Sequence, residues 1–171
     1  MIKKYSYILF ILLFSVLFLF LSFPSETLKG KRSKDGRYID HGDGTIMDTN
    51  TGLMWTKKDS YADLGKCLDW DDSKSYVSRL TTGGHSDWRM PTVKELESIY
   101  EEPKSNRRTF NQGEHGETHL DTIFADRAAY WYWSSETVGS SRARFVYFSR
   151  SYVGDEARGL CFFGGVRAMR R

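Results

Sequence analysis

The chain has 171 residues and a formal net charge of +3. Residues 1–36 carry six basic and two acidic side chains, so the other 135 residues carry 19 basic and 20 acidic ones, a net of −1. The length allows one ordinary domain with an appendage. The nearly neutral remainder removes any argument from overall charge for binding nucleic acid, so we expect no nucleic-acid partner.

An uncharged apolar run from Tyr5 to Phe23 follows two lysines near the N-terminus. Its length is closer to the ~20 residues that span a bilayer than to the about 7–15 residues of a signal-peptide core, and no small-residue cleavage site follows it. We predict that residues 1–23 form a hydrophobic helix, a retained signal-anchor that contacts the membrane through residues 5–23. A cleaved signal peptide is the alternative.

A basic linker is predicted over residues 24–36, ahead of a folded domain over residues 37–171. By the positive-inside rule, the basic residues of this linker would pull it toward the cytoplasm. The export-like run and the use of cysteine favour the other side of the membrane. We expect the domain to lie in the cell envelope, held by an inner-membrane anchor and facing the periplasm or the exterior. It would be secreted if the leader is cleaved.

The first part of the domain is predicted to form strands and then two helices. An Asp-Gly turn at 43–44 between short apolar pieces indicates a hairpin, and residues 53–55 begin the next strand. Apolar side chains follow a helical period over residues 68–80, and Gly83 and Gly84 end that helix. A second helix is predicted over residues 93–100.

The stretch "DWRMPTVKEL", residues 87–96, leads into the second helix. Thr92 and Glu95 have the spacing of a capping box, in which each side chain bonds a backbone N–H of the other residue. Pro91 restricts the backbone just before the helix. Arg89, considered together with Asp87, is expected to form a bidentate pair with a carboxylate and to brace two loops.

Two tryptophans, Trp88 in this stretch and Trp133 in "YWSS", are expected to pack in the core. The stretch is therefore predicted to be a folding device, and we predict no catalytic residue in the chain. Residues 101–129 are polar and irregular, which indicates a long surface loop. The last third alternates apolar segments with Gly/Ser/Asp turns and predicts strands, and its basic end, Arg167, Arg170 and Arg171, is interpreted as a solvated tail.

The chain has two cysteines, Cys67 and Cys161. An even number in an exported domain predicts one disulfide between the first helix and the last strand. Two separate buried thiols and a catalytic thiol are the alternatives. A cysteine-based metal site is disfavoured because two thiolates without Cys-x-x-Cys spacing supply too few ligands.

Two groups of side chains are candidate metal ligands. His115 and His119 could join Glu114 or Glu117, but Gly113 and Gly116 argue against the helix that would align them. Oxygen ligands for calcium could come from four residues: Asp40, Asp43, Asp48 and Asn50. Their spacing does not fit an EF-hand loop, and Asx turns account for them without an ion. We predict no metal and no cofactor.

Three segments, 40–55, 87–96 and 132–135, together resemble the Lcl C-terminal domain family, named after the end domain of the Legionella collagen-like adhesin. The resemblance implies an α+β, C-type-lectin-like fold in which two helices flank small antiparallel sheets. In lectin-like folds a cysteine of the first helix bonds one of the last strand, which matches the places of Cys67 and Cys161. The resemblance also implies cell-surface adhesion, binding of sulfated polysaccharides and formation of a homotrimer.

We therefore predict an extracytoplasmic, membrane-anchored adhesion module that recognises a polysaccharide or a surface protein. The expected contacts are loop arginines: Arg107, Arg108, Arg142 and Arg144. One alternative is a structural or assembly component of the envelope without a small ligand. The other is an enzyme related to the sulfatase-modifying oxidases, which the resemblance in fold allows but which would need reactive cysteines.

Overall fold

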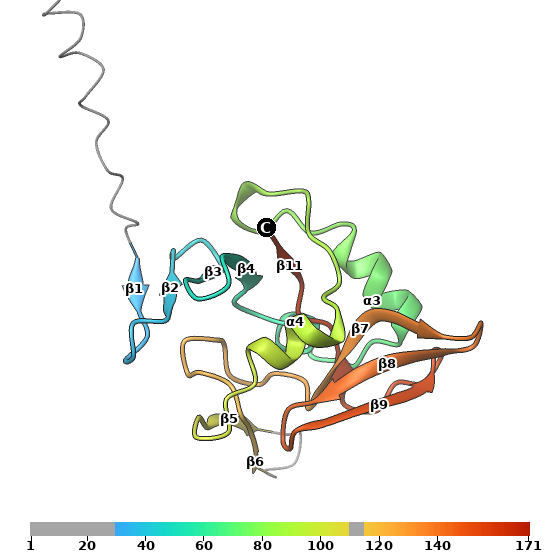
Figure 1. Cartoon of the computed structure of the whole chain (residues 1–171). Coiled ribbons are helices and arrows are strands. Elements are labelled where there is room, and N and C mark those ends of the chain that lie inside the picture. The colour runs from blue at the N-terminus through green and yellow to red at the C-terminus, as the bar shows by residue number, and fades with distance from the viewer. Residues whose placement is uncertain (1–29, 110–114) are drawn as a thin grey trace, which may run out of the picture.

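The computed structural model of the chain describes residues 30–109 and 115–171. The hydrophobic helix predicted over residues 1–23 lies outside these ranges, as do residues 24–29 of the predicted linker. Within the two described ranges, no helix combines the length and the apolar character that crossing a membrane requires. The fold is α+β with small, mostly antiparallel sheets and few helices, which confirms the predicted class (Figure 1).

The first sheet joins the two ends of the described chain. Its strands, in spatial order, are β1 (Lys31–Arg32), β2 (Tyr38–Asp40), β3 (Thr45–Asp48), β4 (Leu53–Thr56) and β11 (Met169–Arg170), all antiparallel. The predicted turn at 43–44 connects β2 to β3. β1 pairs with β2 although we assigned it to a linker. The polar composition of residues 24–36 does not reveal this strand, because strand pairing uses backbone N–H and C=O groups, which polar residues also have.

The second sheet has the spatial order β10 (Gly164–Gly165), β7 (Trp131–Val138), β8 (Arg142–Tyr147) and β9 (Tyr152–Ala157). Its β10–β7 pair is parallel and the others are antiparallel. A separate hairpin of β5 (Asn106–Thr109) and β6 (His115–Thr118) lies where we predicted an irregular loop, so that prediction is wrong in part. Its polar strands carry no hydrophobic alternation, which is the signal that sequence reading uses.

The helices are short, and their start points follow from capping side chains. They are α2 (Ser60–Leu64), α3 (Trp70–Val77) and α4 (Val93–Ser98), with a 3₁₀ turn at Thr82–Gly84. Asp59 caps α2 and Asp69 caps α3, each accepting a backbone N–H of the first turn. The first predicted helix therefore starts later and ends earlier than residues 68–80, and α2 was not predicted because five residues are too few to show a period.

Two hydrophobic cores lie on opposite faces of β7. Tyr132 belongs to the first core, with Tyr38 of β2, Leu96 of α4 and Phe124. Trp131 and Trp133 belong to the second core, with residues of α3 and of the segment 88–90. This alternation is the one predicted for a strand. Figure 1 shows α4 against β7 and β8, and contacts between these elements agree with that view.

The predicted disulfide is confirmed. Cys67 and Cys161 are bonded across 94 residues of sequence, with Cα atoms 5.7 Å apart. Both lie in connecting segments, just before α3 and just before β10, rather than inside a helix and a strand as predicted. In the chain-entropy account, closing a loop of this size stabilises the fold by about 4–5 kcal/mol.

The basic C-terminus is not a solvated tail. Arg167 is fully buried, and its guanidinium donates to the carbonyl oxygens of Thr56 and Lys57 at 2.8 and 2.7 Å. It also donates to the Tyr132 hydroxyl at 3.0 Å and lies 3.5 Å from the carboxylate of Asp59. Sequence position suggested a frayed end, but the buried Asp59 needs a buried cation because an unpaired charge in the interior is costly.

We name this group of three side chains, Asp59, Tyr132 and Arg167, the buried link. Asp59 accepts from the Tyr132 hydroxyl at 2.6 Å and from the backbone N–H of Ala129 at 2.8 Å, in addition to capping α2. Burial raises the pKa of the Tyr132 hydroxyl far above its usual range. The buried link therefore ties α2, β7 and the C-terminal segment together in the interior.

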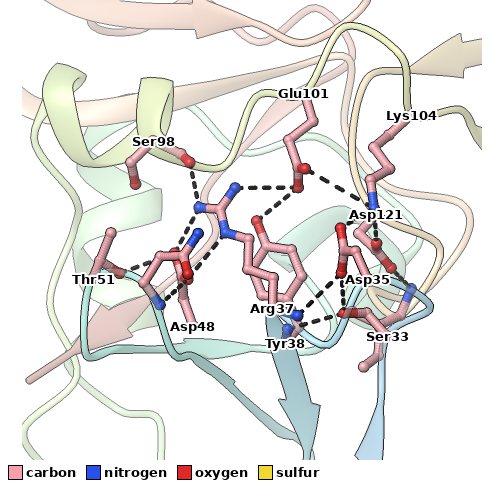
Figure 2. A network of polar contacts seen from close by, with 12 residues as sticks. Ser33, Asp35, Arg37, Tyr38, Asp48, Thr51, Ser98, Glu101, Lys104 and Asp121 are labelled. Atoms are coloured by element: carbon pink, nitrogen blue, oxygen red, sulfur yellow. Dashed lines mark hydrogen bonds and ion pairs between the residues drawn. The ribbon is translucent and has the colours of Figure 1, made fainter.

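A second polar network joins the first sheet to the end of α4 (Figure 2). The Arg37 guanidinium binds both carboxylate oxygens of Asp48, at 3.0 and 2.7 Å, and the Ser98 carbonyl at 2.6 Å. Lys104 Nζ lies 2.6 Å from the carboxylates of both Asp35 and Asp121. This network holds the β1–β2 turn against the segment that follows α4, which explains why a polar N-terminal segment is part of the fold.

Candidate functional site

A cleft of about 430 Å³ lies beside α3, within the size range of small-ligand sites. Its lining comes from three parts of the chain: Trp70, Lys74 and Val77 of α3 with the C-cap residue Ser78, the segment Trp88–Met90, and Ser135 of β7. We name it the α3 cleft. Two indole rings and two cationic side chains therefore share one concave surface.

α3 places Trp70 and Lys74 on the cleft because they are one helical turn apart. The Trp70 indole N–H donates to the Ser134 carbonyl at 2.8 Å, which fixes the ring against β7. The Lys74 ammonium lies 5.6 Å from the centre of that ring. Arg158 also approaches the Trp70 ring, at 4.3 Å, and binds Asp71. The Trp70 wall is thus rigid and lies next to positive charge.

The segment 87–90 is held by the C-terminal strand β11. Backbone hydrogen bonds of 2.9 and 3.0 Å run in both directions between Arg89 and Met169. Asp87 forms a bidentate pair with Arg170, at 2.6 and 2.9 Å, and not with Arg89. The Trp88 indole N–H donates to the Thr82 carbonyl at 3.1 Å. The second indole wall is therefore fixed by three independent contacts.

Arg89 pairs with Glu95, the capping residue of α4. Its two terminal nitrogens bind the two carboxylate oxygens of Glu95 at 2.9 and 2.5 Å. The predicted capping box is present, with Thr92 and Glu95 bonding each other's backbone N–H at 3.2 and 2.8 Å. The Arg89 guanidinium lowers the pKa of Glu95 to about 2, and the Thr92 donors add to this. The Arg89 side chain is 41% exposed, so it reaches both Glu95 and the cleft.

The α3 cleft offers apolar walls and a positive rim. Trp70, Trp88 and Met90 line the hollow and are each at most 7% exposed. Lys74 has no carboxylate within 4.0 Å among the described residues, so its charge is available to a ligand. Such a site suits a ligand with an apolar face and a negative group.

The arginines predicted as ligand contacts lie elsewhere. On β8, Arg142 binds Asp155 and lies 3.6 Å from Glu156, and Arg144 lies 4.0 Å from Glu136. The backbone of Arg107 and Arg108 lies in β5, and their side chains are outside what the structure describes. Arg142 and Arg144 lie in a strand rather than on a loop as predicted, and neither lines the α3 cleft. Their part in binding stays a prediction.

Four of the candidate metal ligands are bonded to other groups of the protein. Asp40 binds Lys57 at 2.6 Å, Asp43 accepts from Thr45, and Asp48 binds Arg37. His119 contacts the Lys104 carbonyl at 3.0 Å, while the side chains of His115 and Glu114 lie outside the described residues. In the part of the chain that is described, no three metal-type side chains gather at one point.

Sequence reasoning predicted none of the lining residues as a ligand contact, and it named Trp88 and Arg89 only as structural residues. Trp70 and Lys74 lie one turn apart in the predicted helix, a spacing that could have placed an aromatic and a cation on one face. No local pattern brings Ser135 to the same place, because the hydrogen bond from its N–H to the Pro91 carbonyl joins distant segments. Trp133 packs in the second core, as predicted, and its indole donates to the Leu68 carbonyl.

The described residues define a small α+β domain with one disulfide and an aromatic cleft that carries positive charge at its rim. Residues 44–164 match the model of the Lcl C-terminal domain, which is more than half of the chain, and the chain belongs to this family. The family is adhesin-like and is not a known enzyme family. A search of curated proteins finds no match.

Proposed function

We propose that the domain is an extracytoplasmic adhesion module that binds an acidic polysaccharide in the α3 cleft. The proposal includes an inner-membrane anchor at residues 5–23 and a domain that faces the periplasm or the exterior. The observation that carries it is the presence of two indole walls and two rim cations in one hollow of about 430 Å³. The apolar face of a sugar ring can stack on the indoles while its carboxylate or sulfate pairs with Lys74, and Arg89, held by Glu95, adds positive charge to the rim.

The adhesin-like family and the fold support this proposal. A C-type-lectin-like fold and a homotrimer, both implied by the family resemblance, are part of it. The bond between the segment before α3 and the segment before β10 supports the lectin-like fold. Three clefts in one trimer would bind a repeating polymer more tightly than one, because the second contact on the same chain is intramolecular.

An enzyme related to the sulfatase-modifying oxidases is not proposed. The chain has two cysteines and they are bonded to each other, which leaves no free thiol for that chemistry. Binding rather than turnover is the property to measure.

The experiment compares three polymers on the full chain: heparin, polygalacturonate and neutral dextran. Calorimetry is expected to show binding of the two acidic polymers, weakened by salt, and none of dextran. Lys74→Ala is expected to weaken binding, whereas Lys94→Ala, an exposed lysine on α4, serves as the matched control. Equal binding of dextran, or wild-type affinity in Lys74→Ala, would contradict the proposal.

Recognition of a surface protein is the second candidate function. Phe162 and Phe163 are 63% and 51% exposed, and aromatic side chains are enriched at protein interfaces. A photo-crosslinking residue at position 162 in the native envelope is expected to capture a partner, and the same residue at position 94 is not. Crosslinks in a chain that binds no polysaccharide would favour a structural component instead.

A further inference from the structure

A second, smaller hollow of about 220 Å³ lies at the outer edge of the first sheet, beside β1. Its charged lining consists of the cations Lys31, Arg32, Lys34 and Lys57 and the carboxylates Asp40 and Asp121. We name it the β1 hollow. It is separate from the α3 cleft, with which it shares no lining residue.

Both carboxylates that line the β1 hollow have a lysine partner within the protein. Asp40 binds Lys57 at 2.6 Å, and Asp121 binds Lys104 at 2.6 Å. Burial alone would raise the pKa of Asp40, but the bonds from Lys57 and from the Gly42 N–H lower it, so this group stays charged and paired. The lining carboxylates therefore bind Lys57 and Lys104, and the other three cations of the lining are Lys31, Arg32 and Lys34.

Those three cations, Lys31, Arg32 and Lys34, are exposed. Within the described ranges none of them has a carboxylate within 4.0 Å; Arg32 donates only to the Gly36 carbonyl, at 3.3 Å. Basic residues on an edge strand can serve simply to prevent strand pairing between molecules. That role does not require the concave surface of about 220 Å³ that these residues line.

The β1 hollow lies close in sequence to the apolar run, which points to a membrane surface as its partner. Six residues, 24–29, separate the apolar run from Gly30, and a fully extended chain of that length spans at most about 20 Å. If residues 5–23 lie in a membrane, the hollow stays close to the surface of that membrane. Basic residues next to a membrane segment are attracted to anionic lipids.

We propose that the β1 hollow binds the phosphate headgroups of anionic phospholipids in the membrane that holds the chain. This inference rests on the proposed membrane anchor and is independent of the polysaccharide ligand. Contact at the β1 hollow orients the domain, since the first sheet then faces the membrane. The α3 cleft is built from other elements and is left for a ligand.

The test is hydrogen exchange of the full chain reconstituted in vesicles. Amides of residues 30–40 are expected to exchange about fivefold more slowly in vesicles containing phosphatidylglycerol than in phosphatidylcholine alone, the factor that about one cation at an anionic surface supplies. The triple variant Lys31→Gln, Arg32→Gln, Lys34→Gln is expected to lose this difference. A matched triple variant with the same charge change, Lys66→Gln, Arg79→Gln, Lys94→Gln, is expected to keep it.

Equal exchange in both lipids, or a chain that stays in the soluble fraction, would overturn the proposal. The same slowing by inorganic phosphate with phosphatidylcholine vesicles would assign the hollow to a free anion and overturn the lipid assignment. The triple variant of Lys31, Arg32 and Lys34 is expected to bind polysaccharide as tightly as the wild type does. A failure of this inference is therefore distinguishable from a failure of the proposed function.

Discussion

The buried link and the rim of the α3 cleft both place a cation beside aromatic rings, but in different surroundings. Arg167 is fully buried, lies 4.7 Å from the centre of the Phe124 ring, and donates to two carbonyls and to Tyr132. Lys74 is exposed beside Trp70 and has no carboxylate partner in the described part of the chain. The two cations therefore differ in their partners within the fold. A cation whose partners lie inside the protein stabilises the structure, whereas a cation without such partners can bind a ligand.

The largest expected effect comes from breaking the buried link. Arg167→Met replaces the guanidinium with an apolar side chain of similar length. The variant leaves the buried Asp59 without its cation. Breaking a buried pair in this way costs about 3–5 kcal/mol, so the free energy of unfolding is expected to fall by that amount. Urea denaturation followed by tryptophan fluorescence measures it. A loss below about 1 kcal/mol would show that Arg167 is not a structural cation.

The pair at the edge of the cleft is expected to have an intermediate effect. Glu95→Gln keeps an oxygen for the capping box but removes the charge that pairs with Arg89, at a cost of about 1–2 kcal/mol at neutral pH. The pKa of Glu95 is lowered from an ordinary value of 4.5 to about 2, so its stabilisation is full above pH 4.5 and is lost as the pH falls toward 2.

The stability curves of wild type and Glu95→Gln are therefore expected to converge between pH 4.5 and pH 2. Denaturation midpoints at several pH values in this window measure the convergence. A constant difference across the window would mean that titration of Glu95 does not contribute to stability. The variant Thr92→Val serves as a check. It removes the hydroxyl that caps α4 and leaves the ion pair between Glu95 and Arg89 in place.

The cleft rim is expected to affect binding and to leave stability nearly unchanged. Lys74→Ala should weaken binding of an acidic polysaccharide about fivefold to tenfold, the effect of one charge-assisted contact, since Lys74 has no partner to lose within the described fold. Its free energy of unfolding should stay within about 0.5 kcal/mol of the wild type. A large loss of stability would place Lys74 with the structural cations.

The smallest effect is expected at the surface of β8. Arg142 binds Asp155 on the neighbouring strand, and both side chains are exposed. Exposed ion pairs contribute little to stability, so Arg142→Ala should leave the free energy of unfolding almost unchanged. The same variant tests the original prediction that Arg142 contacts the ligand. Loss of polysaccharide binding in Arg142→Ala with intact binding in Lys74→Ala would move the site from the α3 cleft to β8.

Local rules predicted those parts of the fold that depend on neighbouring residues. The spacing of Thr92 and Glu95 determines the capping box, and strand alternation places Trp133 and Tyr132 on opposite faces. The count of cysteines predicted the bond between Cys67 and Cys161. These features need little knowledge of what lies far along the chain.

Features that depend on distant partners were not predictable from local patterns. Asp87 binds Arg170 and Arg89 binds Glu95, and a sequence in which these four charged residues could pair in several ways does not say which pairing forms. The burial of Arg167 depends on Asp59, which lies more than a hundred residues earlier. The cleft is likewise a product of three segments that meet only in the folded chain.

The most direct test of the central claim follows the indole N–H signals of the five tryptophans by nuclear magnetic resonance. Short fragments of an acidic polysaccharide are added to the full chain. The signals of Trp70 and Trp88, which line the α3 cleft, are expected to shift and saturate, while that of the fully buried Trp55 in the other core stays in place. Binding that leaves Trp70 and Trp88 unchanged would contradict the assignment of the ligand site to the α3 cleft.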